Sequence, residues 1–180
     1  MELFAQAISI AAMTFNILSY QCKTDRGAIG MQLCGGALFS VSFLMLGATV
    51  GGILNVIAVL RAVVFMNRGR LHAEHPAWLG GFVALFLLAY LATFTLFDKP
   101  FTAANALLEL LPVVGMIATT LSFRLQNARA IRLYGLISSP SWLVYNVACR
   151  SVGAIICESL SLISILVGLW RHDRKGRRQR

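Results

Sequence analysis

The chain has 180 residues, of which 58% are hydrophobic and only 13% are charged. An ordinary soluble domain is about 45–50% apolar and about 25% charged, so this composition excludes a soluble globular protein. Sixteen Lys and Arg against seven Asp and Glu give a formal net charge of +9. That charge would suggest a nucleic-acid ligand in a soluble protein, but here the positive residues lie between long apolar runs. The composition therefore predicts an integral membrane protein.

Seven apolar runs approach the roughly 20 residues that a helix needs to cross a bilayer. The second and third runs are continuous, with Arg61 as their only charge, so the chain must fold back near Gly47 or near Gly51 and Gly52. The predicted fold class is all-α, a polytopic membrane protein with seven transmembrane helices. The predicted spans are residues 2–21, 29–47, 48–67, 77–97, 104–122, 132–149 and 151–170.

The positive residues predict the orientation, because short cytoplasmic loops keep an excess of Lys and Arg. Only Lys99 and Arg150 fall on one side of the seven spans, and Arg61, near the end of the third span, is expected to reach the opposite surface. We therefore expect a bacterial inner-membrane protein with its N-terminus outside and its C-terminus in the cytoplasm. The cytoplasmic cations are Lys23, Arg26, Arg61, Arg68, Arg70, Arg124, Arg129, Arg132, Arg171, Arg174, Lys175, Arg177, Arg178 and Arg180.

The basic tail, residues 172–180, directly follows the last span. Anionic lipid attracts each cation at a membrane surface by about 1 kcal/mol, so the tail predicts contact with membrane lipid. A basic segment of nine residues does not predict a nucleic-acid partner.

The chain also matches itself without gaps at an offset of 103 residues. The match pairs Leu18-Ser19-Tyr20 with Leu121-Ser122-Phe123 and continues to Arg68 and Arg171. Because 103 residues cover four predicted helices, an even number, the two copies have the same orientation, as in parallel-repeat transporters. The predicted arrangement is three helices, one linker helix and three helices. Its parts are residues 1–70, 71–103 and 104–171, followed by the tail.

Two prolines distinguish the second copy from the first. Pro112 and Pro140 lie inside predicted spans and match Ser9 and Ala37 at the 103-residue offset. Proline kinks helices, so we expect hinges only in the second copy.

Polar residues inside the spans are the strongest candidates for chemistry, because a charge near the bilayer centre costs at least about 2.5–3.5 kcal/mol. Glu158 lies about eight residues into the seventh span. It has two interpretations: a functional one, as a proton carrier or substrate contact, and a structural one, as a hydrogen-bond partner for another helix. Asn55 and Asn146 have the same two interpretations. Glu109 and Arg150 lie closer to the outer surface, where we expect them to be hydrated.

Small residues and histidines are less specific. Three glycine pairs, at residues 35–36, 51–52 and 80–81, predict close approach between helices. His72 and His75 are too few ligands to predict a metal site, and no motif predicts a cofactor. One buried acid without a base or nucleophile does not form a catalytic set, so we do not expect an enzyme.

Two stretches in the second copy resemble a known family. They are Leu110-Leu111-Pro112-Val113-Val114-Gly115, and Ser141-Trp142-Leu143-Val144-Tyr145-Asn146 continuing through Ser151-Val152-Gly153-Ala154 to Glu158. They resemble the YgjV-type bacterial inner-membrane proteins, and the resemblance extends over nearly the whole chain. That family is distantly similar to the SWEET, semiSWEET and PQ-loop transporters, which have the same three-plus-one-plus-three arrangement and an outside N-terminus.

The resemblance to these transporters implies an aromatic residue and an asparagine from each half around the solute. Phe39 and Trp142 match the aromatic pair, and Asn55 matches one asparagine. Glu158 replaces the other asparagine, which argues against an uncharged sugar and for another substrate or for coupling to protons or cations.

The leading hypothesis is therefore a small-solute transporter or facilitator with its site between the two halves. The alternative is a non-transporting membrane assembly or regulatory protein in which the polar residues only join helices. A cavity that reaches Glu158 would favour transport, whereas a fully packed interior would favour the alternative. Its partners would be membrane lipid and an unidentified small solute, with a homo-oligomer left open. The candidate site residues are Phe39, Asn55, Trp142, Asn146 and Glu158, with Pro112 and Pro140 as hinges.

Overall fold

The computed structural model describes the backbone of residues 2–19, 25–125 and 128–178, and the side chains of residues 2–18, 30–125, 132–167, 169 and 170. It is 88% helical, which confirms the all-α prediction. Each predicted span corresponds to one long helix, and one short helix, α4, was not predicted. The helices are α1 (Glu2–Ser19), α2 (Asp25–Met45), α3 (Thr49–Met66), α4 (Arg68–Leu71), α5 (Pro76–Thr95), α6 (Ala103–Leu125), α7 (Ala128–Ala148) and α8 (Val152–Arg178).

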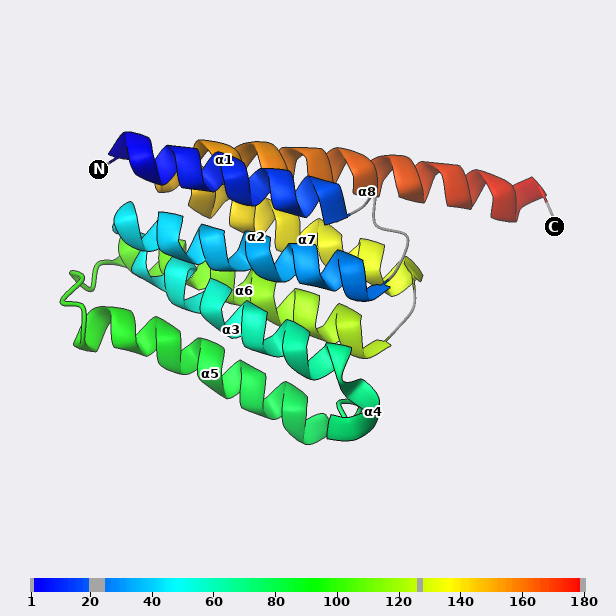
Figure 1. The fold of residues 1–180 in the computed structure, drawn as a ribbon, viewed down its shortest axis with the longest axis horizontal. Helices are drawn as coiled ribbons and strands as arrows, with labels where there is room; N and C mark the ends of the chain where they lie inside the picture. Colours follow the sequence, from blue (N-terminus) through cyan, green and yellow to red (C-terminus); the bar gives the residue numbers. More distant parts are fainter. Residues whose placement is uncertain (1, 20–24, 126–127, 179–180) are drawn as a thin grey trace.

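The seven long helices lie side by side in one bundle and alternate in direction (Figure 1). Helices α1, α3, α6 and α8 run one way, whereas α2, α5 and α7 run the other. α1 packs against α2 and α8, α6 packs against α7 and α3, and α5 covers one side of the bundle against α3 and α6. We call the end with the α2–α3 and α7–α8 turns the hairpin end, and the end where α1, α3 and α6 finish the basic end.

The two turns at the hairpin end have the same backbone conformation at positions 103 residues apart. Gly47 and Arg150 both adopt positive φ, 73° and 55°. The Ala48 N–H donates to the Phe43 carbonyl at 2.8 Å, and 103 residues later the Ser151 N–H donates to the Asn146 carbonyl at 3.0 Å. The chain therefore folds back at Gly47, one of the two positions predicted, where a residue without a Cβ adopts positive φ at little cost.

The distribution of polar and apolar side chains is the reverse of that in a soluble protein. Every long helix exposes large apolar side chains, such as Leu88 on α5 and Leu166 on α8, whereas Arg61, Glu109 and Asn146 are buried. Within the described residues α3, α5 and α6 are long and apolar enough to cross a membrane, and α1, α2 and α8 contain shorter apolar stretches. Such a surface suits a hydrocarbon environment better than water.

Glycines permit close helix contacts at two of the three predicted pairs. A Cβ built on Gly51 would lie 2.7 Å from Cε1 of Tyr145, and one on Gly36 would lie 3.3 Å from Val59. The prediction is wrong for the third pair, because no atom lies within 4 Å of a Cβ built on Gly80 or Gly81. These two residues lie on the exposed side of α5, which packs against α3 and α6.

Both prolines lie inside long helices, as predicted, but in different surroundings. Pro112 is fully buried in α6, whereas Pro140 is exposed on α7. Each removes one backbone hydrogen bond from its helix. Their role as hinges stays a prediction.

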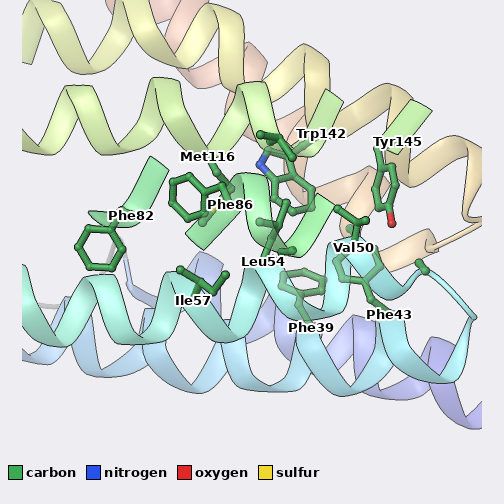
Figure 2. Close-up of a cluster of buried hydrophobic side chains, with 14 of the residues drawn as sticks. Phe39, Phe43, Val50, Leu54, Ile57, Phe82, Phe86, Met116, Trp142 and Tyr145 are labelled. Atoms are coloured by element: carbon green, nitrogen blue, oxygen red, sulfur yellow. The ribbon is translucent and has the colours of Figure 1, made fainter. Parts of the chain in front are cut away.

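The core is one cluster of buried apolar residues near the hairpin end and the middle of the bundle (Figure 2). Aromatic rings from different helices meet in it: the Phe43 ring centroid lies 6.1 Å from that of Trp142 and 6.1 Å from that of Tyr145. Phe82 and Phe86 bring α5 into the same cluster. This packing holds the walls of the site described next.

Candidate functional site

A cavity of about 660 Å³ lies inside the bundle, lined by residues of α1, α2, α3, α6, α7 and α8. Its volume falls within the range of small-molecule sites, about 300–1,000 Å³. The structure brings all five predicted site residues to its wall: Phe39, Asn55, Trp142, Asn146 and Glu158.

Glu158 reaches the cavity from α8. It lies six residues after Val152, the first residue of that helix, which places it about 9 Å from the hairpin end at 1.5 Å per residue. Ser139 of α7 lines the cavity together with it. The carboxyl group is therefore available to a molecule in the cavity.

The two asparagines differ in their bonding. Asn55 donates from Nδ2 to the carbonyl of Gly51 at 2.8 Å, a bond within α3, so the interpretation that it joins two helices is not supported. Asn146 is 1% exposed, and its Oδ1 has no hydrogen-bond partner. A buried acceptor without a partner usually marks a place for a ligand or an ordered water.

The aromatic wall is formed by Phe39, Phe43 and Trp142. The Phe39 and Phe43 rings are stacked with centroids 6.1 Å apart, and Phe43 in turn meets Trp142 (Figure 2). A Cβ built on Gly115 would lie 2.7 Å from Cδ1 of Trp142, so only glycine leaves room there for the indole. Trp142 therefore both packs in the core and faces the cavity.

Arg61 corrects one expectation from the sequence. Its side chain does not reach the membrane surface but is buried between α3 and α6. It donates from Nη1 to Thr120 Oγ1 at 2.9 Å and to the Met116 carbonyl at 3.3 Å, and its guanidinium lies 4.9 Å from the Phe123 ring centroid. Its Nε has no partner. Arg61 lines the cavity. Its place as the only charge in a long apolar run was the signal in the sequence that could have marked it as a site residue.

Glu109 corrects a second expectation. It is not hydrated but 0% exposed, and it forms an ion pair with Lys99, which lies in the loop between α5 and α6. The side chain of Lys99 is 29% exposed. Arg150 is exposed, as expected.

Hydrogen bonds between distant segments close the hairpin end. The Gly51 N–H of α3 donates to the Tyr145 hydroxyl of α7 at 3.0 Å. The Ser9 and Ser151 hydroxyls lie 3.0 Å apart. Gln6 of α1 donates to the Arg150 carbonyl at 2.6 Å and accepts from the Val152 N–H at 3.0 Å.

Toward the basic end the wall becomes more polar, with Asn16, Gln32 and Arg132 among its residues. Arg132 and Ser139 were not proposed as site residues, since nothing local in α7 separates wall residues from other polar ones. The side chains of Lys23, Arg26, Arg129 and the basic tail, on which the predicted orientation partly depends, lie outside the described residues.

Positions 103 residues apart line the cavity together. The same offset that relates the two hairpin turns thus relates the walls of the site. The pairs include Asn16 and Thr119, Gly36 and Ser139, Phe39 and Trp142, Phe43 and Asn146, Asn55 and Glu158, and Arg61 and Ser164.

The apolar outer surface and the buried polar groups together define a helical membrane protein. Residues 3–176 match the Imp-YgjV family, which is described as a bacterial inner membrane protein, and the chain belongs to this family. The resemblance to YgjV-type proteins is therefore confirmed. No curated protein and no solved structure matches the chain significantly.

Proposed function

We propose that the protein is an inner-membrane transporter or facilitator of a small solute, with its site in the cavity around Glu158. The observation that carries the proposal is the cavity itself: a fully packed interior was expected for the alternative assembly or regulatory protein. Burying a carboxyl and a guanidinium group costs free energy, and their presence on a cavity wall is explained by contact with a solute.

We propose further that all seven long helices cross the membrane as two parallel three-helix repeats around the linker helix α5. The matching turns at Gly47 and Arg150 support this arrangement. So do the equivalent contacts of α1 with α8 and of α6 with α3, and the position of α5 outside the cavity wall. A site between repeats of this kind is reached alternately from the two sides when one repeat rocks against the other.

The proposed orientation places the hairpin end outside and the basic end in the cytoplasm, since 13 of the 16 Lys and Arg fall on the cytoplasmic side once the buried Arg61 is left out. The hydrogen bonds at Tyr145 and Ser151 would then close the cavity toward the outside. The polar wall at Arg132 leads toward the cytoplasm. On this interpretation the structure is an inward-facing state, with Pro112 and Pro140 as hinges of the second repeat.

The test compares solute pools in membrane vesicles from cells with the protein, without it, and with Glu158→Gln. Glu158→Gln keeps the shape of the side chain and removes its charge. Glu2→Gln is the matched control, because Glu2 is exposed at the start of α1 and remote from the cavity wall.

We expect at least one solute to equilibrate faster with the protein present, Glu158→Gln to abolish that difference, and Glu2→Gln to retain it. A protein-dependent solute unaffected by Glu158→Gln would remove Glu158 from the mechanism. No protein-dependent solute at all would refute transport.

A further inference from the structure

The cavity contains charges of both signs that the protein leaves without counterions. Glu158 contributes a carboxyl group, and Arg61 and Arg132 contribute guanidinium groups. The ion pair of Lys99 with Glu109 lies outside this wall, and among the residues whose side chains are described none forms an ion pair with Glu158, Arg61 or Arg132. A charge removed from water is costly unless it is paired, so the cavity favours a molecule that brings charges of its own.

The opposite charges lie at different depths. Arg61 lies twelve residues, or about 18 Å, into α3, whereas Glu158 lies about 9 Å into α8, which runs the same way from the same end. The guanidinium of Arg61 lies against the ring of Phe123, which also packs on Phe65, so it lies toward the basic end and away from Glu158. The two charges are therefore separated along the cavity, an arrangement that suits a dipolar molecule.

Unpartnered polar atoms occur at both depths. Asn146, 1% exposed and on the hairpin side of Glu158, has an Oδ1 with no hydrogen-bond partner. Arg61, 6% exposed, has an Nε with none. The part of the cavity near the hairpin end thus offers hydrogen-bond acceptors, and the part nearer the basic end offers hydrogen-bond donors.

The aromatic wall completes the recognition surface. The Trp142 ring lies at the cavity wall among Phe39 and Phe43. An ammonium group against a tryptophan face gains about 0.5–2 kcal/mol, and the rings can also cover an apolar side chain.

We propose, on the basis of the transport function above, that the solute is a small zwitterion of the amino acid or short peptide class. Its ammonium group lies against Glu158 and Asn146, and its carboxylate faces Arg61. A neutral sugar would leave Glu158 and Arg61 unpaired, and a simple organic cation would leave Arg61 without a counterion.

The experiment measures ligand binding to the purified full-length protein by thermal shift and calorimetry. The ligands are the twenty standard amino acids and the dipeptide glycyl-leucine, with glucose as the neutral comparison. The tightest zwitterion is then compared with its N-acetyl derivative, which lacks the ammonium, and with its amide, which lacks the carboxylate.

We expect at least one zwitterion to bind, and both derivatives to bind roughly tenfold to hundredfold more weakly, as for the loss of a charge-assisted hydrogen bond. Glu158→Gln should weaken the zwitterion by a similar factor but leave the N-acetyl derivative unchanged. Arg61→Gln should likewise weaken binding of the zwitterion but leave binding of the amide unchanged. The control is Arg70→Gln, at an exposed position. The derivative comparison uses the unaltered protein, so it decides the matter even if Arg61→Gln does not fold.

Each other outcome overturns the assignment. An amide that binds as tightly as its parent would indicate a cation site, and glucose binding without any zwitterion would indicate a neutral solute. Binding of no zwitterion, or of the parent and N-acetyl forms alike, would also refute it. The two proposals fail separately: a vesicle solute that depends on Glu158 but is no zwitterion refutes only this inference, whereas zwitterion binding without vesicle transport refutes only the transport function.

Discussion

Replacing Lys99 by methionine should destabilise the protein far more than replacing its partner. Glu109 is 0% exposed, whereas the Lys99 side chain is 29% exposed. Lys99→Met keeps most of the apolar stem and removes the charge, which leaves the Glu109 carboxylate buried and unpaired. Glu109→Gln instead leaves a lysine that can turn toward water.

The magnitude follows from this difference in burial. Breaking a buried ion pair by removing one partner costs about 3–5 kcal/mol. Because Lys99 is partly hydrated, we expect Lys99→Met to cost about 3 kcal/mol and Glu109→Gln about 1 kcal/mol. At roughly 2–4 °C for each kcal/mol in a chain of this size, Lys99→Met lowers the melting temperature by about 6–12 °C. The double variant, which buries no unpaired charge, should recover most of that loss.

The assay is thermal unfolding of the purified protein in one detergent, followed by circular dichroism, at one protein concentration and scan rate. Lys99→Arg is the control, since it keeps the charge and should stay within about 1 kcal/mol of the unaltered protein. Equal losses in the two single variants, or no gain in the double variant, would refute the idea that a buried unpaired carboxylate causes the effect.

Two further substitutions test the closed hairpin end. Gly153→Ala should destabilise the protein by about 1–3 kcal/mol, because the added Cβ would overlap the backbone of Ser9. Gly80→Ala is the control and should not destabilise it, because no atom lies within 4 Å of a Cβ there; equal effects in thermal unfolding would contradict the packing described. Tyr145→Phe keeps the ring but leaves the Gly51 N–H without its acceptor, so it should cost about 1–2 kcal/mol in thermal unfolding. An unchanged melting temperature would show that this hydrogen bond does not stabilise the hairpin end.

The elements of the fold could be predicted because their causes are local. The length of each apolar run determined where a helix forms, and the observed turns at Gly47 and Arg150 lie 103 residues apart, which is the offset of the self-match. The short helix α4 was missed, because four residues carry no periodic signal.

The candidate site was predictable for a different reason. An acid or amide inside an apolar run is conspicuous in the sequence, and Asn55, Asn146 and Glu158 all line the cavity. Phe39 and Trp142 followed from their equivalent places in the repeat and from the transporter resemblance.

Contacts between distant segments could not be predicted in this way. Whether Arg61 reaches the surface or bonds to Thr120 depends on how closely α6 approaches α3. Whether Glu109 is hydrated or paired depends on where the loop carrying Lys99 folds. In both cases the sequence predicted exposure and the structure shows burial.

The sequence by itself determined that this is a helical membrane protein with few internal charges, because hydrophobic run length and charge position are properties of the chain alone. Only the tertiary structure decided that a cavity remains at the centre and that charges of both signs line it without a counterion among the described residues. A cavity exists only where side chains from six helices fail to fill the space between them, and their combined volume and orientation are not properties of any one segment.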